Sequence, residues 1–387
     1  MVRSSAGGLS ALAHGYDPEL CPSSHAASDV LERFSSSVKP RSVISLPAVT
    51  SVRVFLFILV ALMSVWVLFP ILTRSNHEPV AAHSLQSVPR MSWTANLHLG
   101  QPNWRSYTLR QAAQALAVDG ILIVCTVSHP YMPFLNNWLI SLAKYNRHQA
   151  VLIIAEDYTT LDFVNSRWPG HSVLIPPASS ETTSLRFGSQ GFFNLTARRP
   201  KYLLEILELG YSVLYNDVDM VWLADPFSYF KNNREVYIID DMALLKTEYH
   251  SHALPPPGKK GRTYICSCML FLKSTEGAKL LMRTWIEELK ERQWSPSVKT
   301  NDQPAFNWAL NKTAGQVDVY LLPQVAFPSG GLYFKNDSWR KETENKHVIV
   351  HNNYVVGFDQ KIKRFRAHNL WFVELDAGLS PLAEKGG

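Results

Sequence analysis

The sequence predicts an α/β domain, a Rossmann-like mixed but largely parallel sheet flanked by helices, behind a single N-terminal transmembrane helix. One uncharged apolar run near the N-terminus is long enough to cross a bilayer. After residue 116, short apolar segments typical of buried strands alternate with segments of helical periodicity. The chain of 387 residues is 46% hydrophobic, which is the composition of a globular protein.

The apolar run at residues 54–72 contains no charged residue. A long polar segment precedes it, so an uncleaved anchor is favoured over a signal peptide, and its isolation disfavours a buried core helix. Lys39, Arg41 and Arg53 lie on its N-terminal side, which predicts a cytosolic N-terminus. We therefore expect a type II Golgi membrane protein with residues 1–53 as its cytosolic tail.

Residues 73–115 are predicted to form a stem, and residues 116–387 a catalytic domain in the lumen. Three glycosylation sequons agree with a lumenal location, although sequons also arise by chance. Their acceptor residues are Asn194, Asn311 and Asn336.

The first half of the domain reads as strands separated by helices. The strands are β-branched and apolar, whereas the helices repeat apolar residues every three to four positions. The expected strands are residues 121–127, 150–157 and 172–175, and the expected helices are 131–145 and 163–168.

A polar loop is predicted at residues 176–196, followed by a helix at residues 197–210. Pro200 suits the first turn of that helix, and Gly210 suits its C-terminal end. Further on, strands are expected at residues 211–216 and 264–272, and a helix with an apolar stripe from residue 278 to residue 289.

Charge and cysteine content exclude several classes of protein. The net charge is +6, but no nucleic-acid-binding motif accompanies it, so nucleic acid is not an expected partner. Four cysteines are too few for a disulfide scaffold, and Cys266 and Cys268 match no zinc-ligand spacing. Cys125 reads as a buried apolar residue, and we do not expect it to form a bridge with Cys266 or Cys268.

The clearest chemical signal is the pair Asp217 and Asp219, which follows an apolar strand. Residues two apart on an extended chain point the same way, and ligands of open α/β sheets bind beyond strand ends. Two carboxylates at that place are hard oxygen ligands for Mn²⁺ or Mg²⁺. The alternatives are a pair of solvated acids in a turn and an acid that caps a helix.

The segment 203–227, LLEILELGYSVLYNDVDMVWLADPF, resembles the metal-motif region of glycosyltransferase family 77. Further segments resemble the plant cell-wall branch of that family, including its rhamnogalacturonan II xylosyltransferases, and the resemblance extends over about residues 100–382. These segments are GRTYICSCMLFL (261–272), NDQPAFNWALN (301–311), FPSGGLYFKN (327–336) and HNNYVVGFDQKIKRFR (351–366).

The resemblance implies a GT-A fold and a role for several residues. Asp217 and Asp219 match the metal motif, and His351 matches a third metal ligand. Lys361 or Lys363 resembles the group that holds the donor diphosphate. The remaining implied donor contacts are Thr126 and Val127 at the uridine, Arg199 and Lys201 at the nucleotide, and the catalytic pair Asp302 and Gln303 at the sugar.

Three alternatives stay open at these positions. Asp302 is also a good N-cap for the helix that starts near Pro304. His351 can equally be a structural histidine. Arg199 and Lys201 can simply be solvated residues at the start of a helix.

The implied activity is retaining transfer of α-xylose from UDP-xylose to L-fucose of the pectin rhamnogalacturonan II. The expected partners are a UDP-sugar donor, a pectic glycan acceptor and the Golgi membrane, with Mn²⁺ or Mg²⁺ as cofactor. The alternatives are another donor, UDP-arabinose or UDP-galactose, and a catalytically silent Golgi scaffold.

Overall fold

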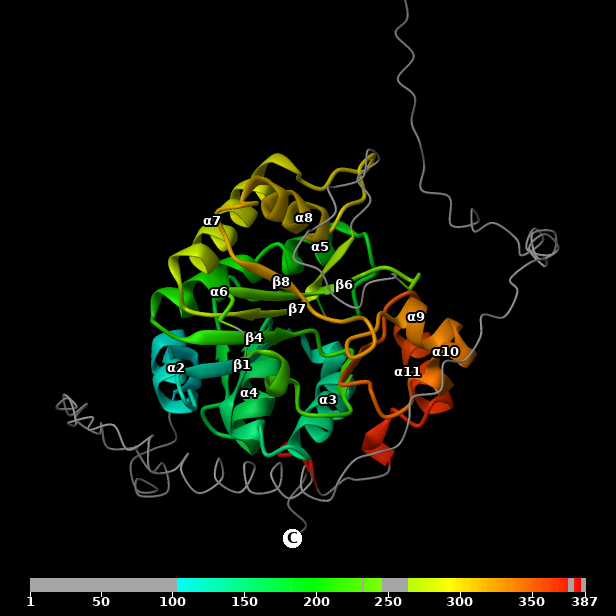
Figure 1. Ribbon diagram of the computed structural model, residues 1–387. Helices are drawn as coiled ribbons and strands as arrows, with labels where there is room; N and C mark the ends of the chain where they lie inside the picture. Colours follow the sequence, from blue (N-terminus) through cyan, green and yellow to red (C-terminus); the bar gives the residue numbers. More distant parts are fainter. Residues whose placement is uncertain (1–102, 182, 232, 246–263, 375–378, 384–387) are drawn as a thin grey trace, which may run out of the picture. The chain divides into compact units, whose positions relative to one another are not determined.

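The computed structural model (Figure 1) describes residues 103–181, 183–231, 233–245, 264–374 and 379–383. All of them belong to the unit that spans residues 90–387. The predicted tail and the predicted anchor at residues 54–72 lie outside these ranges. Within the ranges, no helix combines the length and the apolar character that a bilayer crossing requires.

A seven-stranded sheet with the order β3-β2-β1-β4-β7-β6-β8 forms the centre of the domain. The first four strands in this order are parallel, β7 is antiparallel to both of its neighbours, and β8 is parallel to β6. The predicted mixed, largely parallel sheet is thereby confirmed. The strands are β1 Ile121–Val127, β2 Val151–Ala155, β3 Ser172–Leu174, β4 Ser212–Asn216, β6 Val236–Asp240, β7 Ile265–Leu272 and β8 Val319–Leu321.

Helices cover both faces of this sheet. Along β1, Ile123 and Cys125 pack into one core with Trp138, while Leu122 joins a second core with Trp285. This alternation is the period of two that a strand imposes. The helices are α2 Leu109–Leu116, α3 Met132–Ala143, α4 Tyr158–Arg167, α5 Gln190–Thr196, α6 Arg199–Glu208, α7 Glu276–Glu291, α8 Gln303–Lys312, α9 Gly330–Lys335, α10 Asp337–Glu342 and α11 Phe358–Ala367.

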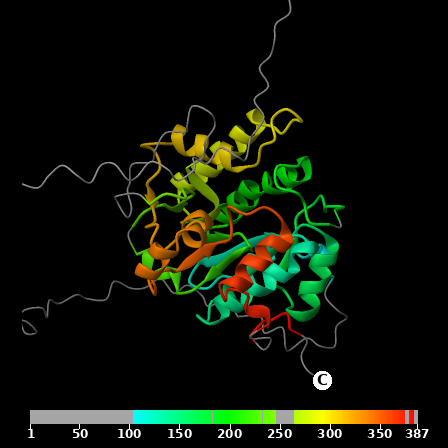
Figure 2. The same ribbon diagram turned by 90° about the vertical axis from the view of Figure 1, so that its right-hand side faces the viewer.

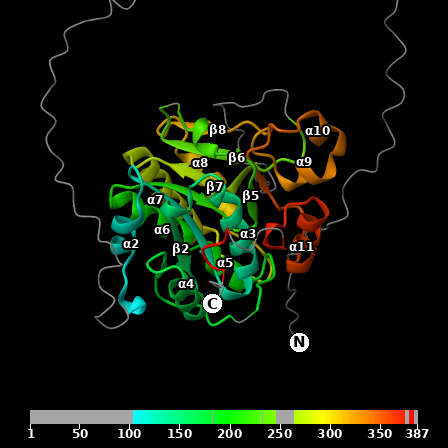
Figure 3. The same ribbon diagram turned by 90° about the horizontal axis from the view of Figure 1, so that it is seen from below.

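The C-terminal helices gather on one side of the domain, orange to red in Figure 2. Among them, α11 lies beside α3, as the view from below shows (Figure 3). Phe365 of α11 and Phe134 of α3 are fully buried, with ring centroids 6.4 Å apart. The end of the chain is thus tied to an early helix through the aromatic core.

A second, two-stranded sheet pairs β5 (Met220–Trp222) with β9 (Ile349–His351) in antiparallel register. All six residues of this ribbon are buried. Met220 lies opposite His351, so the ribbon brings the end of β9 next to the acidic pair that precedes β5.

Among the described residues, five α-helices occur where none was predicted: α2, α5, α9, α10 and α11. α5 occupies the end of the predicted polar loop at 176–196, and Ser189 caps it by accepting a hydrogen bond from the backbone N–H of Phe192. α2 falls inside the predicted stem at residues 73–115. Thr108 and Gln111 form a capping box at its start, and Leu109 packs into the second core, so the folded domain reaches further toward the N-terminus than residue 116.

Candidate active site

Asp217, Asp219 and His351 converge at the carboxyl end of β4. One ligand atom of each residue lies within 4.8 Å of the others. Asp217 follows β4, and its backbone N–H donates to the Cys268 carbonyl at 2.8 Å. Asp219 precedes β5, and its carbonyl accepts from the Asn352 N–H at 3.0 Å. The backbone at Asp217 is therefore held by β7, and the backbone at Asp219 by the residue that follows β9.

His351 faces Asp219 because the β5–β9 ribbon sets its position. Its Nε2 lies 3.4 Å from Asp219 Oδ1, and its side chain is 7% exposed. One imidazole nitrogen and two carboxylates form a donor set that suits Mn²⁺ or Mg²⁺. The residues predicted to hold a divalent cation are thus brought together and fit it chemically.

Lys361 of α11 forms an ion pair with Asp219 Oδ2. Burial opposes ionisation of this carboxyl, but the charges of Lys361 and His351 outweigh burial and hold the pKa of Asp219 far below its usual range. Lys363, two residues further along the same helix, is exposed. Of the two lysines left open by the sequence, Lys361 is the one that the fold directs into the cluster.

Arg199 of α6 is buried and connects several parts of the site. Its Nη2 lies 3.0 Å from Asp217 Oδ1, and its Nη1 lies 3.2 Å from Asp302 Oδ2. The same Nη1 donates to the Ser267 carbonyl at 2.7 Å. Tyr215 also donates to Asp217 Oδ1, at 2.8 Å. Arg199 is therefore a member of the site and not a solvated residue at a helix start.

Asp302 holds the N-cap position of α8, but its side chain makes no capping hydrogen bond. The carboxylate faces Arg199 instead. Burial raises the pKa of Asp302, while the charge of Arg199 opposes that shift. The capping role that the sequence allowed is therefore wrong, because the buried guanidinium offers this carboxylate a stronger partner than backbone N–H groups do.

Gln303, the first residue of α8, donates from Nε2 to Asp241 Oδ2 at 2.8 Å. Asn353 donates from Nδ2 to Asp241 Oδ1 at 2.7 Å. Burial raises the pKa of Asp241 to about 6, although these hydrogen bonds oppose the shift. Asp241 follows β6. The sequence indicates only that Asp240 and Asp241 end a strand and could line the pocket, whereas the structure identifies the hydrogen-bond partners of Asp241.

The remaining predicted donor contacts lie at the edge of this cluster or away from it. Thr126 Oγ1 is 3.1 Å from the Tyr215 hydroxyl, so it joins the network through Tyr215. Val127 is buried at the end of β1, and its carbonyl accepts from the Glu156 N–H at 2.9 Å. Lys201 instead lines a cavity of about 320 Å³ together with Phe193 and Trp294.

All three sequon asparagines are exposed. Asn194 lies on α5 and lines the same cavity as Lys201. Asn311 lies in the last turn of α8, and Asn336 caps α10 by accepting a hydrogen bond from the Trp339 N–H. Their glycosylation stays a prediction.

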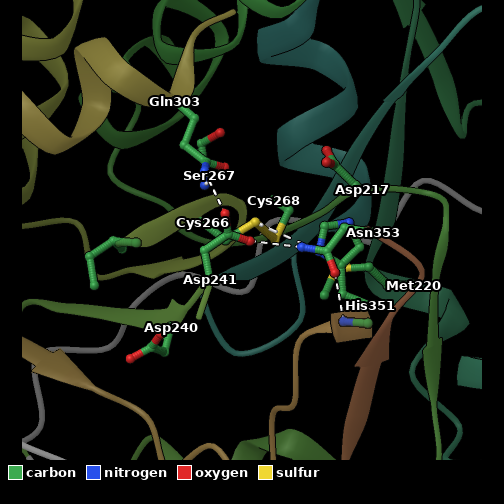
Figure 4. The surroundings of a disulfide bond; sticks show 12 residues. Asp217, Met220, Asp240, Asp241, Cys266, Ser267, Cys268, Gln303, His351 and Asn353 are labelled. Atoms are coloured by element: carbon green, nitrogen blue, oxygen red, sulfur yellow. Dashed lines mark hydrogen bonds between the residues drawn. A yellow bond between two sulfur atoms is a disulfide. The ribbon is translucent and has the colours of Figure 1, made fainter. Parts of the chain in front are cut away.

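Sequence reasoning missed the disulfide between Cys266 and Cys268, which Figure 4 shows among the site residues. Cys125 is free and buried, as expected. The Cys-x-Cys spacing on a strand was the available signal, because side chains two apart on a strand share a face.

This chain is similar to known proteins in family and in sequence. Residues 146–365 match the family model of the nucleotide-diphospho-sugar transferases. The Arabidopsis thaliana UDP-D-xylose:L-fucose alpha-1,3-D-xylosyltransferase MGP4 is 64% identical over 284 residues, which cover 73% of this chain and 79% of that protein. The Arabidopsis UDP-D-xylose:L-fucose alpha-1,3-D-xylosyltransferase 1 is 61% identical over 286 residues, with coverage of 73% and 79%.

Among solved structures, galactosyltransferase LgtC in complex with donor and acceptor sugar analogs aligns with a TM-score of 0.40 and 14% identity, covering 64% of this chain and 94% of that chain. The family match and the mixed sheet together identify a GT-A-like nucleotide-diphospho-sugar transferase fold. Since the family model covers more than half of the chain and two relatives exceed 60% identity, the chain belongs to the nucleotide-diphospho-sugar transferases of glycosyltransferase family 77.

Proposed function

We propose that this protein is a metal-dependent, retaining xylosyltransferase that moves xylose from UDP-xylose to L-fucose and keeps the α configuration. The observation that carries the proposal is its identity of 64% to a UDP-D-xylose:L-fucose alpha-1,3-D-xylosyltransferase over most of both chains. The convergence of Asp217, Asp219 and His351 supports it, because a silent scaffold has no need to keep this donor set together.

A divalent cation bound by Asp217, Asp219 and His351 would supply Lewis-acid neutralisation of the departing diphosphate. Two positively charged side chains already neutralise the carboxylates in this structure. Lys361 pairs with Asp219, and Arg199 pairs with Asp217. Binding of the UDP-sugar would release Lys361 from its ion pair with Asp219. The released ammonium would then be free to hold a diphosphate oxygen, which is the role expected for this lysine.

The donor sugar is proposed to lie against Asp302, Gln303 and Asp241. In the front-face mechanism, the acceptor hydroxyl attacks from the side that the nucleotide leaves, and a diphosphate oxygen takes its proton. Arg199 holds Asp302 in place, and Asp241 holds the amide of Gln303. The Gln303 carbonyl oxygen would stabilise positive charge on the sugar, so Gln303→Ala should lower turnover more than donor affinity.

We further propose that the acceptor fucose belongs to the pectin rhamnogalacturonan II, and that residues 54–72 anchor the protein in the Golgi membrane. The net charge of +6 favours encounters with an acidic polysaccharide. Manganese is the proposed cation, with magnesium as the alternative.

The deciding experiment incubates the purified protein and Mn²⁺ with UDP-xylose, UDP-arabinose or UDP-galactose, using L-fucose as acceptor. NMR of the product gives its anomeric configuration. An α-xyloside supports the proposal, whereas a β-linked product overturns both mechanism and reaction. An α-linked product from another donor corrects the donor alone, and absence of transfer from all three favours the silent scaffold.

A further inference from the structure

The tripeptide from Cys266 to Cys268 lies at the start of β7, and a disulfide closes it. The Cα atoms of the two cysteines are only 5.3 Å apart. A fully extended strand separates alternate Cα atoms by more, about 6.6 Å at 3.3 Å per residue. The chain is therefore compressed at this point.

The compression coincides with a β-bulge. Ile238 of β6 pairs with Leu270 of β7, but the next residue, Ile239, pairs with Cys266. The residues between Cys266 and Leu270 are thus extra on the β7 side. Bulges are often found beside active sites, where they redirect backbone and side-chain groups.

The bulged backbone contacts three candidate site residues. The Ser267 carbonyl accepts from Arg199 Nη1 at 2.7 Å, and the Ser267 N–H donates to Gln303 Oε1 at 3.4 Å. The Cys268 carbonyl accepts from the Asp217 N–H at 2.8 Å. One short segment thus touches the metal motif, the buried arginine and the proposed sugar contact.

The disulfide itself contacts the fourth site residue. Cys266 Sγ lies 3.7 Å from His351 Nδ1, while Nε2 of the same ring faces Asp219. One ring nitrogen of His351 therefore faces Cys266 and the other faces Asp219. Figure 4 shows His351 beside the disulfide. Groups that hold the second nitrogen of a metal-binding histidine orient its ring, and losing them typically costs about 10–100-fold in metal affinity or activity.

We propose that Cys266 and Cys268 are positioning residues whose disulfide holds the bulge of β7, so that Asp217 and His351 are set for the divalent cation and Gln303 for the donor sugar. The inference rests on the proposed function for the identity of the metal site. Opening the bridge would let the bulge relax and free the His351 ring from its sulfur contact.

Ordinary core packing is the competing explanation, because both sulfurs are buried. Cys125 provides a matched control for it. This cysteine is also buried, packs in the same core cluster and has no disulfide partner. If the cysteines only filled the core, alanine at position 125 and alanine at positions 266 and 268 would change Mn²⁺ affinity to a similar extent.

The test compares the wild type, the double variant Cys266→Ala/Cys268→Ala and the variant Cys125→Ala. Mass spectrometry after alkylation first establishes whether the isolated protein carries the bridge. Mn²⁺ affinity is then measured directly from the EPR signal of free Mn²⁺, and circular dichroism confirms that each variant is folded.

A second arm opens the bridge in the folded wild type. Dithiothreitol donates two electrons and two protons, which leaves two cysteine thiols and a cyclic disulfide of the reagent. The reagent is removed without oxygen before the Mn²⁺ titration, and the alkylated thiols are counted.

We expect the double variant and the reduced wild type to bind Mn²⁺ about 10–100-fold more weakly, while Cys125→Ala binds as the wild type does. Absence of the bridge in the isolated protein, or unchanged Mn²⁺ affinity in the double variant, would overturn the proposal. Because affinity is read without turnover, tight Mn²⁺ binding with no xylose transfer would instead count against the proposed function.

Discussion

Arg199 is buried directly against Asp302, with Nη1 3.2 Å from the carboxylate Oδ2. The guanidinium also reaches Asp217 with its other terminal nitrogen. The side chain of Arg199 therefore connects the start of α6 with the start of α8 at the site. The planar fork of an arginine can serve two carboxylates at once, which a lysine ammonium cannot do in the same geometry.

Arg199→Lys should therefore destabilise the fold, because the shorter cation leaves one buried carboxylate without its partner. We expect a loss of about 3–5 kcal/mol in the free energy of unfolding. Urea denaturation followed by fluorescence measures it. The control is Lys201→Ala, an exposed position on the same helix, which should stay within about 0.5 kcal/mol of the wild type. A loss below about 1 kcal/mol for Arg199→Lys would contradict the buried network.

Asp219→Asn should abolish transfer and Mn²⁺ binding while the domain stays folded. The substitution removes the charge that binds the cation but keeps the shape of the side chain. EDTA should have the same effect on the wild type, reversed by added Mn²⁺. The matched control is Asp225→Asn, since Asp225 pairs with Arg147 outside the cluster. Full activity of the wild type in EDTA would exclude a metal-dependent reaction.

Lys361→Ala and Lys363→Ala form a matched pair on α11. Lys361 faces Asp219, whereas Lys363 is exposed. Loss of a charged hydrogen bond to the diphosphate should weaken UDP binding by about 1.5–3 kcal/mol in the first variant only. Titration calorimetry with Mn²⁺ and UDP measures both affinities. Equal UDP affinities in the two variants would show that Lys361 does not bind the diphosphate.

Turnover should fall as the pH drops below about 6, because burial raises the pKa of Asp241 to about 6. Protonation below that pH removes an acceptor that Gln303 and Asn353 share. The raised pKa also means that the folded state binds this proton more readily than the unfolded state. Stability from this group is thus present at about pH 4 and is lost as the pH rises through 6.

Turnover of the wild type and of Asp241→Asn, measured from about pH 5 to pH 8, checks this assignment. Turnover of the wild type should fall as the pH drops through about 6, and the variant should be slower but lack that fall. The same acidic limb in both proteins would show that another group titrates.

Gly330→Ala should disturb the metal site through the backbone. A Cβ at this position would lie 2.3 Å from the Asn353 carbonyl oxygen and 2.8 Å from that of His351. Overpacking of this kind typically costs about 1–3 kcal/mol. Here the displaced atoms include the backbone carbonyl of His351, a proposed metal ligand. We therefore expect weaker Mn²⁺ binding together with a lower melting temperature.

Gly277→Ala is the control for Gly330→Ala. Its Cβ would meet only the end of the Glu235 side chain, which can move, so Mn²⁺ affinity should be unchanged. Equal Mn²⁺ affinities for the two variants would argue against coupling between Gly330 and His351.

Strands and long helices were predictable because their patterns are local. β1 has the predicted bounds, and the helix at 197–210 is present as α6 between Pro200 in its first turn and Gly210, whose φ of +94° matches a helix end. The short helix α5 was not predicted because its seven residues span only two helical turns, which is too short for a clear apolar periodicity. Its cap, Ser189, lies in a run of polar residues that reads equally well as a loop.

The site was predictable where neighbours in sequence are also neighbours in space. Asp217 and Asp219 follow from one strand end, whereas His351 came from a resemblance and not from any local pattern. Lys201, which the resemblance groups with Arg199, is exposed and lines a different cavity, and its contact with the nucleotide stays a prediction. Two positions along a helix rotate a side chain by about 200°, so the residues face opposite ways.

The direction of β7 has a consequence for how this site can vary between relatives. Because β7 runs opposite to β4, the beginning of β7 meets the end of β4, with Asn216 opposite Met269. The Cys266–Cys268 segment therefore lies at the site, ahead of the residues of β7 that pair with β4. A change within the Cys266–Cys268 segment can therefore reshape the side of the site that contacts Arg199 and Gln303 while the central sheet keeps its register.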